Sequence, residues 1–330
     1  MCSMGTDQKN MNRRAFLHTS ARLGGVSVAT LGMGFWLKNR STRPQETIAA
    51  TMKERLILPP DPNLPAMVIV NGGDPRKMVN QAVHELGGIK RFIDDSDVVV
   101  VKPNMAWDRT PEQAANTNPD AVAAVVALCL KGGASKVIVT DVSCHEPRRC
   151  YQRSGIADAA NAAGAKVIFP EKHKFHEIAI NGQVLTEWPV FEPFLDADKI
   201  INMPVAKHHN LTGVTLGMKN WFGALGGKRN QLHQKINESI VDLAELMKPT
   251  LTILDAYRIL QRNGPTGGNI ADVRLNNTII AATDPVALDS YAANTFFDLN
   301  PIQVQFVKLA HERKVGNMYF EEIRQKVIEV

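Results

Sequence analysis

The sequence predicts an α/β protein with a mostly parallel sheet, helices on both of its faces, and a small antiparallel hairpin near residues 177–191. Short β-branched runs such as residues 98–102 alternate along the chain with helical segments such as residues 118–130. This alternation, with strands that are continuously apolar, is typical of a parallel sheet covered on both sides. Asn181-Gly182 lies between two apolar stretches and indicates a hairpin turn.

The individual elements follow from short apolar runs and helix start signals. Expected strands are residues 66–70, 98–102, 136–140, 166–169, 200–203, 250–254 and 278–282. Expected helices are residues 77–86, 118–130, 151–163, 237–247 and 285–297, followed by two short terminal helices. Pro119 and Pro285 favour helix starts, because proline lacks an N–H that the first turn would leave unbonded anyway.

The N-terminal residues predict an export signal. Residues 12–18, Asn-Arg-Arg-Ala-Phe-Leu-His, precede a weakly apolar stretch at 24–37 and resemble a twin-arginine signal, read by the twin-arginine translocase. The alternative is an amphipathic N-terminal helix. We therefore expect a signal over 1–40, a proline-rich linker over 41–65, and one α/β domain over 66–330. The expected location is the periplasm or the outer face of the cytoplasmic membrane, whether or not the signal is cleaved.

Composition argues for an ordinary globular protein with a mild basic excess. Hydrophobic residues make up 44% and charged residues 22%, with a formal net charge of +5. The positive charges are scattered, which favours a small anionic ligand over nucleic acid. The four cysteines do not form a disulfide framework. Cys144 and Cys150 could pair in an oxidising compartment, or Cys144 and His145 could contribute to a metal site.

The most unusual segment is residues 199–234, where an apolar run is followed by lysines, histidines and glycines. Glycine lets the backbone approach an anion or metal closely. A solvated basic loop is the alternative. Against that alternative, the segment carries apolar residues such as Trp221 and Phe222, which predict that it packs against the protein.

Polar residues follow five of the expected strands, and we expect them at one edge of the sheet, where open α/β sheets bind ligands. They are Lys102 with Asn104, Asp141, Lys207 with His208 and His209, Asp255, and Asp284. Asp284 equally fits a helix cap before Pro285, and Asp141 and Asp255 could form simple ion pairs with lysines. His208 and His209 are adjacent, so at most one is expected to face a pocket.

These patterns define three sets of candidates. The candidate catalytic residues are His208, His209, Lys219, His233 and Asp141. The candidate ligand-binding residues are Lys102, Asn104, Lys207, Asn220, Lys228 and Asp255. The candidate ligands of a divalent metal are Asp141, His145, His208 and Asp255.

Several motifs together resemble the family called domain of unknown function 362, over roughly residues 97–300. They are the Val99–Asn104 strand end, residues 207–223 with the Lys219-Asn220-x-x-Gly223 block, Gly264-Pro265, and residues 284–289. Members of that family occur with a ferredoxin-type iron–sulfur module or behind a twin-arginine leader. This chain has no Cys-x2-Cys-x2-Cys run, which argues against an iron–sulfur cluster of its own.

The sequence supports two functions of different classes. The first is an exported enzyme that binds a small anion, with lysines holding its oxygens and a histidine or lysine moving protons. The alternative is a non-catalytic binding or maturation partner of a periplasmic iron–sulfur redox system. A serine hydrolase and a dinucleotide dehydrogenase are excluded by the lack of Gly-x-Ser-x-Gly and Gly-x-Gly-x-x-Gly in a strand-to-helix setting.

Overall fold

The computed structural model describes residues 61–330. The chain divides into two units, residues 1–47 and 48–330, and all the described residues belong to the second. The expected twin-arginine signal and most of the expected linker lie outside the described residues. Within residues 61–330, none of the helices combines the length and the apolar character needed to cross a bilayer.

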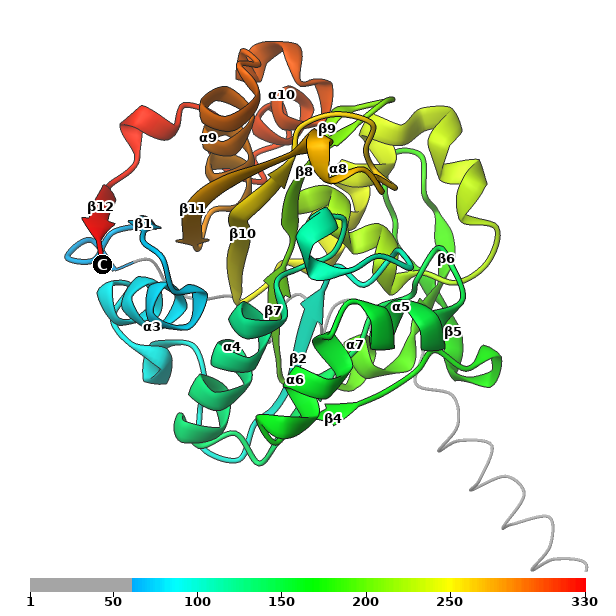
Figure 1. The fold of residues 1–330 in the computed structure, drawn as a ribbon. Helices are drawn as coiled ribbons and strands as arrows, with labels where there is room; N and C mark the ends of the chain where they lie inside the picture. The colour runs from blue at the N-terminus through cyan, green and yellow to red at the C-terminus, as the bar shows by residue number, and fades with distance from the viewer. Residues whose placement is uncertain (1–60) are drawn as a thin grey trace, which may run out of the picture. The chain divides into compact units, whose positions relative to one another are not determined.

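The fold is α/β, built on a mostly parallel mixed sheet with the strand order β12-β1-β11-β10-β7-β2-β3-β4, to which β8 and β9 are joined through β10 (Figure 1). The strands of this sheet are β1 (Met67–Asn71), β2 (Val98–Pro103), β3 (Lys136–Val139), β4 (Lys166–Val167), β7 (Lys199–Met203), β8 (Val205–His209), β9 (Gly213–Thr215), β10 (Leu251–Leu260), β11 (Val273–Ala282) and β12 (Gln325–Glu329). A separate antiparallel pair comprises β5 (Phe175–Ala179) and β6 (Glu187–Phe191). The predicted fold class is confirmed.

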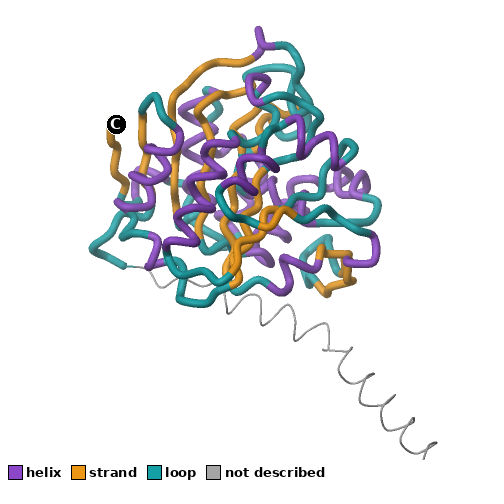
Figure 2. Tube along the Cα trace, turned by 60° about the horizontal axis from the view of Figure 1, so that its bottom comes forward, coloured by secondary structure: helices purple, strands orange, loops and turns teal. Residues whose placement is uncertain are grey.

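Helices cover both faces of the sheet, as Figures 1 and 2 show. One face packs against α3 (Pro75–Glu85), α4 (Pro119–Lys131), α5 (Pro147–Arg153) and α6 (Ile156–Ala162). The other packs against α7 (Glu192–Asp196), α8 (Ile236–Met247), α9 (Pro285–Phe297) and α10 (Gln305–Glu312).

The continuous valine run of β2 follows from this double cover. Val99 and Val101 belong to the core on the α3–α6 side, whereas Val100 belongs to the core on the α8–α10 side. Successive side chains of a strand point to opposite faces, so a strand covered on both faces must be apolar at every position. All three valines are fully buried.

One expected helix is split in two. Residues 151–163 were predicted to form a single helix, but α5 begins at Pro147, ends at Arg153, and is followed by α6 from Ile156. Gly155 between them has φ = 71°, a left-handed conformation that a continuing helix cannot contain. Glu146 starts the first helix early by accepting hydrogen bonds from the N–H groups of Arg148 and Arg149.

The antiparallel hairpin is present, but its strands lie farther from the turn than Asn181-Gly182 predicted. The segment 183–185 was expected to be extended and is instead a loop, because the Asp242 carboxylate accepts hydrogen bonds from the N–H groups of residues 183, 184 and 185, each at 2.9 Å. Arg313 lies 2.8 Å from the same carboxylate. The turn is therefore held both by its own backbone hydrogen bonds, such as that from the Gly182 N–H to the Leu185 carbonyl at 2.9 Å, and by the Asp242 carboxylate on α8.

Two predictions about strand ends are wrong. β10 continues to Leu260, paired with β11, so Asp255 lies inside the strand and not at its end. β11 runs antiparallel to both β1 and β10, which places Asp284 at the opposite edge of the sheet. There Asp284 caps α9 through the N–H groups of Val286 and Ala287. The C-terminal strand β12, parallel to β1, was not predicted.

Candidate functional site

A cavity of about 390 Å³ lies at the carboxyl edge of β2, β3 and β7. It receives residues that are far apart in the sequence, because parallel strands end on the same side of the sheet. The polar and ionisable residues that line it are Asn104, Asp141, Cys144, Lys207, His209, Thr215, Lys219, Asn220, Arg229, Asn230 and His233. Its apolar walls include Ala106, Trp107, Val142, Phe222 and Pro265.

A buried ion pair forms the floor of the site. Lys102 Nζ lies 2.7 Å from Asp141 Oδ1, and both side chains are almost wholly buried. The second carboxylate oxygen, Oδ2, accepts a hydrogen bond of 2.7 Å from the N–H of Met105. Burial lowers the pKa of Lys102, and the Asp141 charge opposes that shift.

Gly223 is required where η4 (Met218–Ala224) passes over this ion pair. A Cβ at this position would collide with the Asp141 carboxylate and come within 2.7 Å of Lys102 Nζ. Glycine in the Lys-Asn-x-x-Gly block therefore permits close approach of the backbone to the buried charges.

Three buried asparagines join the strand ends to η4. Asn104 Nδ2 donates to Asn220 Oδ1 at 3.0 Å, and Asn220 Nδ2 donates to Asn202 Oδ1 at 2.8 Å. Asn202 Nδ2 in turn donates to the Gly217 carbonyl at 2.9 Å. Because each side-chain amide both donates and accepts, this series of hydrogen bonds fixes the orientation of all three asparagines.

Lys207 is the first donor in this series of hydrogen bonds and is held in place by two acceptors. Its ammonium donates to Asn104 Oδ1 at 3.0 Å and to the Ala115 carbonyl at 2.6 Å. Burial lowers the pKa of Lys207 to about 7, and the charges of Cys144 and Asp141 oppose this shift only in part.

Lys219 also lines the cavity and differs from the other two lysines. Its side chain is 8% exposed, and no described residue accepts a hydrogen bond or forms an ion pair with its ammonium. Its charged end lies 4.7 Å from the centroid of the Phe222 ring. Burial lowers the pKa of Lys219 to about 8, and Arg229 lowers it further while Cys144 opposes the shift.

Thr215 is the second polar group of the cavity that lacks a partner. It lies opposite Lys207 in the antiparallel β8–β9 pair, is 4% exposed, and its hydroxyl makes no hydrogen bond within residues 61–330. Buried polar groups are nearly always hydrogen-bonded, so an unbonded ammonium and hydroxyl that border one cavity indicate a place for a ligand.

His209 is a neutral hydrogen-bond donor. Its Nδ1 accepts a hydrogen bond from the N–H of Leu211 at 3.1 Å, so in the neutral ring the proton sits on Nε2. Burial, followed by the charges of Lys219 and Lys207, lowers the pKa of His209 to about 3. The neighbouring His208 does not line the cavity, as the alternation of side chains along an extended strand requires.

The predicted residues divide into two groups. Asn104, Asp141, Lys207, His209, Lys219, Asn220 and His233 line the cavity, and Lys102 lies directly beneath Asp141. Burial lowers the pKa of His233, whose ring makes an edge contact with Phe222. His208 and the exposed Lys228 lie outside the lining.

Asp255 does not line the cavity, and its contacts stabilise the fold. Its carboxylate accepts hydrogen bonds from the N–H groups of Asn118, at 2.7 Å, and Tyr257, at 3.0 Å, and so supports the start of α4. Burial raises the pKa of Asp255 to about 6. His145 is exposed and stacks edge-on against Trp107. Within residues 61–330 no three His, Cys, Asp or Glu side chains are grouped to hold a metal ion.

Sequence reasoning missed Thr215, Arg229 and Asp289 as contributors. Arg229 donates to the carbonyls of Val142 and Ser143, each at 2.6 Å, and so ties η5 (Arg229–Lys235) to the segment after β3. Asp289 accepts hydrogen bonds from the N–H groups of Gly217 and Met218, which anchors the start of η4. The short β8–β9 hairpin, with its turn around Asn210, was the signal that could have placed Thr215.

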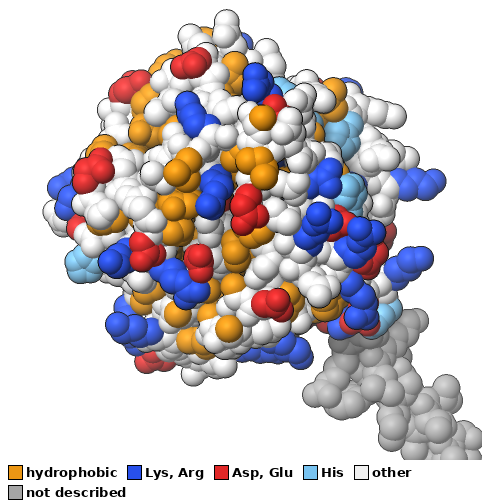
Figure 3. All heavy atoms as spheres, viewed as in Figure 1, with side chains coloured by type: hydrophobic (Ala, Val, Ile, Leu, Met, Phe, Trp, Pro, Cys, Tyr) orange, Lys and Arg blue, Asp and Glu red, His pale blue; other side chains and the backbone are white. Residues whose placement is uncertain are grey.

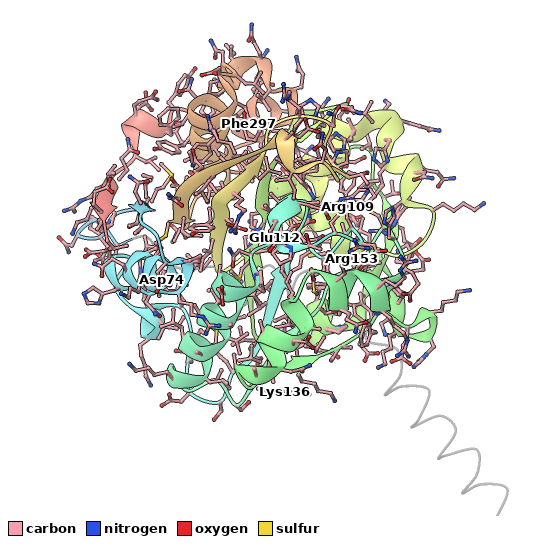
Figure 4. All side chains as sticks on the ribbon, in the orientation of Figure 1. Asp74, Arg109, Glu112, Lys136, Arg153 and Phe297 are labelled. Atoms are coloured by element: carbon pink, nitrogen blue, oxygen red, sulfur yellow. The ribbon has the colours of Figure 1, made fainter. Side chains whose placement is uncertain are left out.

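Two loops border the cavity, one after β2 and one after β10, and they are joined by hydrogen bonds. Arg109 donates to the Gly267 carbonyl at 3.3 Å, and Gln113 Nε2 donates to the Gly268 carbonyl at 2.7 Å. Figure 4 shows Arg109 and Glu112 on the segment that follows β2, with Arg153 of α5 nearby and Lys136 at the opposite end of the sheet. On the face drawn in Figure 3, basic and acidic side chains are interspersed.

Cys144 and Cys150 are both free, so the structure contains no disulfide between them. Cys150 is buried, and burial raises the pKa of its thiol to about 11. Cys144 is exposed and lines the cavity.

Comparisons with known proteins identify a family and a curated relative. The chain is 26% identical over 251 residues to thylakoid-associated protein sll1697 of Synechocystis sp., a match that covers 70% of this chain and 77% of the relative. Among solved structures, the lactate racemase apoprotein of Thermoanaerobacterium thermosaccharolyticum is matched with 10% identity and a TM-score of 0.39, over 66% of this chain. A Thermotoga maritima protein is matched with 13% identity and a TM-score of 0.35, over 59% of this chain. The match spans 54% of each of these two solved chains. A family model matches residues 99–294, and the chain therefore belongs to the domain of unknown function family DUF362.

Proposed function

We propose that the protein is an enzyme that binds a small carboxylate or phosphate in the cavity at the carboxyl edge of the sheet and moves protons on it. The observation that carries this proposal is Lys219, an almost fully buried ammonium that borders the cavity without a hydrogen-bond acceptor or an ion-pair partner among the described residues. Burying an unpaired charge is costly, and a ligand anion would remove most of that cost.

The charges of the cavity favour an anion. Lys207, Lys219 and Arg229 are basic lining residues, whereas the carboxylate among the lining residues, Asp141, is already paired with Lys102. A cavity of about 390 Å³ lies near the lower end of the range for small-molecule sites, which begins at about 300 Å³. The ligand is therefore a small anion with an apolar part that meets Trp107 and Phe222.

Acid–base chemistry follows from the lysines more than from the histidines. A pKa of about 8 for Lys219 and about 7 for Lys207 allows either amine to accept or release a proton near neutral pH. His209, fixed as a neutral Nε2–H donor, would hydrogen-bond to a ligand oxygen and stabilise charge that develops there.

Calorimetric titration with acetate and with inorganic phosphate tests the binding step. We expect saturable binding of at least one anion to the wild type and a loss of about tenfold or more in Lys219→Met, the loss of one charge-assisted hydrogen bond. Lys136→Met is the matched control, because Lys136 is an exposed lysine at the other end of the sheet. Equal binding by wild type and Lys219→Met would reject the site.

Proton transfer is tested by isotope exchange. Small carboxylates incubated with the protein in D2O would take up deuterium at the carbon next to the carboxylate, measured by NMR. We expect exchange with the wild type and Lys136→Met, and none with Lys219→Met. A protein that binds the anion but catalyses no exchange with any carboxylate tested would favour the non-catalytic binding function.

We also propose export, supported by Arg13-Arg14 and the apolar stretch that follows them. A fusion of residues 1–65 to a folded reporter should reach the periplasm through the twin-arginine translocase. Replacing both arginines by lysine should abolish export, whereas retention of export in that variant would reject this part of the proposal.

A further inference from the structure

The environment of Lys219 suits a covalent step as well as ion pairing. The cavity brings three lysines close together, and they differ in what holds the nitrogen. Lys102 is paired with Asp141, and Lys207 donates to two carbonyl oxygens. The nitrogen of Lys219 has no acceptor among the described residues and borders the open cavity. It is the lysine whose nitrogen can reach a ligand atom without breaking an existing hydrogen bond.

The groups around Lys219 match those that imine formation needs. The amine must lose its proton, the carbonyl oxygen must be hydrogen-bonded as negative charge develops on it, and a second group must carry protons. His209 Nε2–H and the Thr215 hydroxyl are donors without a partner among the described residues, and both line the same cavity. Lys207 lies opposite Thr215 and supplies a second amine.

Resting on the proposed anion site, we infer that Lys219 forms an imine with the carbonyl carbon of a small 2-oxo acid. The Lys219 nitrogen attacks the carbonyl carbon, a C–N bond forms, and the carbonyl oxygen takes up a proton to give a carbinolamine. The second proton of the amine then moves to that oxygen, which leaves as water, and the C=N bond forms. The sum is amine plus carbonyl giving imine plus water, so no oxidant or reductant is consumed.

A 2-oxo acid fits the cavity better than a neutral aldehyde. Its carboxylate matches the basic lining of Lys207 and Arg229, and its carbonyl group lies one bond away from that carboxylate. The buried amine is also a good nucleophile near neutral pH, because burial lowers the pKa of Lys219 to about 8 and so leaves an appreciable neutral fraction.

Reductive trapping tests the inference. The full chain is incubated with pyruvate and cyanoborohydride, which reduces an imine to a stable amine, and the product is measured by intact mass and peptide mapping. We expect one adduct per chain on Lys219 in the wild type and in Lys136→Met, and none at that peptide in Lys219→Arg. Adducts spread over surface lysines at equal rates would overturn the inference.

The pH profile and a binding control distinguish failure of imine formation from failure of the anion site. With pyruvate kept at saturating concentration, trapping should speed up as pH rises through about 8, because Lys219 loses its proton there; Lys207, Arg229 and Cys144 are the other ionisable groups that face it. Acetate binding is measured on the same preparations. Binding that depends on Lys219 without an adduct rejects the imine and leaves the anion site intact, whereas the absence of both rejects the proposed function itself.

Discussion

The Lys102 ammonium lies 2.7 Å from the Asp141 carboxylate, and the two side chains are 0% and 1% exposed. A buried ion pair of this kind adds little net stability, but the loss of one partner leaves an uncompensated charge in the interior. The pair joins the ends of β2 and β3 beneath the cavity, so its integrity sets the position of the cavity floor.

Asp141→Asn should lower the free energy of unfolding by about 3–5 kcal/mol, because Lys102 then has no counter-charge. Lys102→Met should cost a similar amount. The double variant should be more stable than the sum of the two losses implies, since neither charge is left alone. Urea unfolding of the four proteins measures this coupling, and additive losses would show that the two charges act independently.

Gly223→Ala should destabilise the protein by about 1–3 kcal/mol, the usual cost of overpacking. The added methyl group has no space above the Asp141 carboxylate. Gly73→Ala is the matched control, because a Cβ there meets nothing within 4 Å. A shift in the urea midpoint of Gly223→Ala no larger than that of the control would contradict the close contact.

The sequence was sufficient for the fold class and for part of the site. Val99, Val100 and Val101 marked a strand covered on both faces, and the structure buries all three. Residues that follow β2, β3 and β7 were expected at one edge, and Asn104, Asp141 and Lys207 do line one cavity. This succeeded because the direction of parallel strands fixes where their ends lie.

The failures have physical causes outside the local pattern. Asp284 was assigned to the same edge because a run of residues does not reveal that β11 is antiparallel to its neighbours. Asp255 was placed at a strand end because the pairing that extends β10 comes from β11. The neutral state of His209 depends chiefly on burial and on the charge of Lys219, and neither is visible from residues 207–211.

Anion affinity should fall as pH rises through about 8. The pKa of Lys219 is lowered to about 8, chiefly by burial, so the ammonium that attracts the anion is present below this pH and lost above it. Lys207, with a pKa of about 7, adds an earlier and smaller fall. Calorimetric titration of acetate across this range measures the profile, and Lys219→Met should lack the fall near pH 8. An affinity independent of pH in the wild type would contradict the role of the lysines.

Asp289 should make stability depend on pH between about 4 and 7. Burial raises its pKa from 3.8 to about 7, although the N–H groups of Gly217 and Met218 oppose the shift. In this window the folded protein holds a proton that the unfolded chain has released, so stability falls as pH rises, by up to about 1.4 kcal/mol per pH unit. The stabilisation is fully present below the unfolded pKa and is lost once pH passes about 7.

Asp289→Asn isolates this effect. Asp255 also titrates in the window, with a pKa of about 6, but it is present in both proteins and cancels in the comparison. The variant loses one acceptor for the start of η4, so it should be less stable than the wild type at acid pH, and the difference should shrink as pH rises toward 7. Urea unfolding at a series of pH values measures the difference. A gap between the two proteins that stays constant or widens with pH would show that the Asp289 carboxylate is already ionised in the folded state.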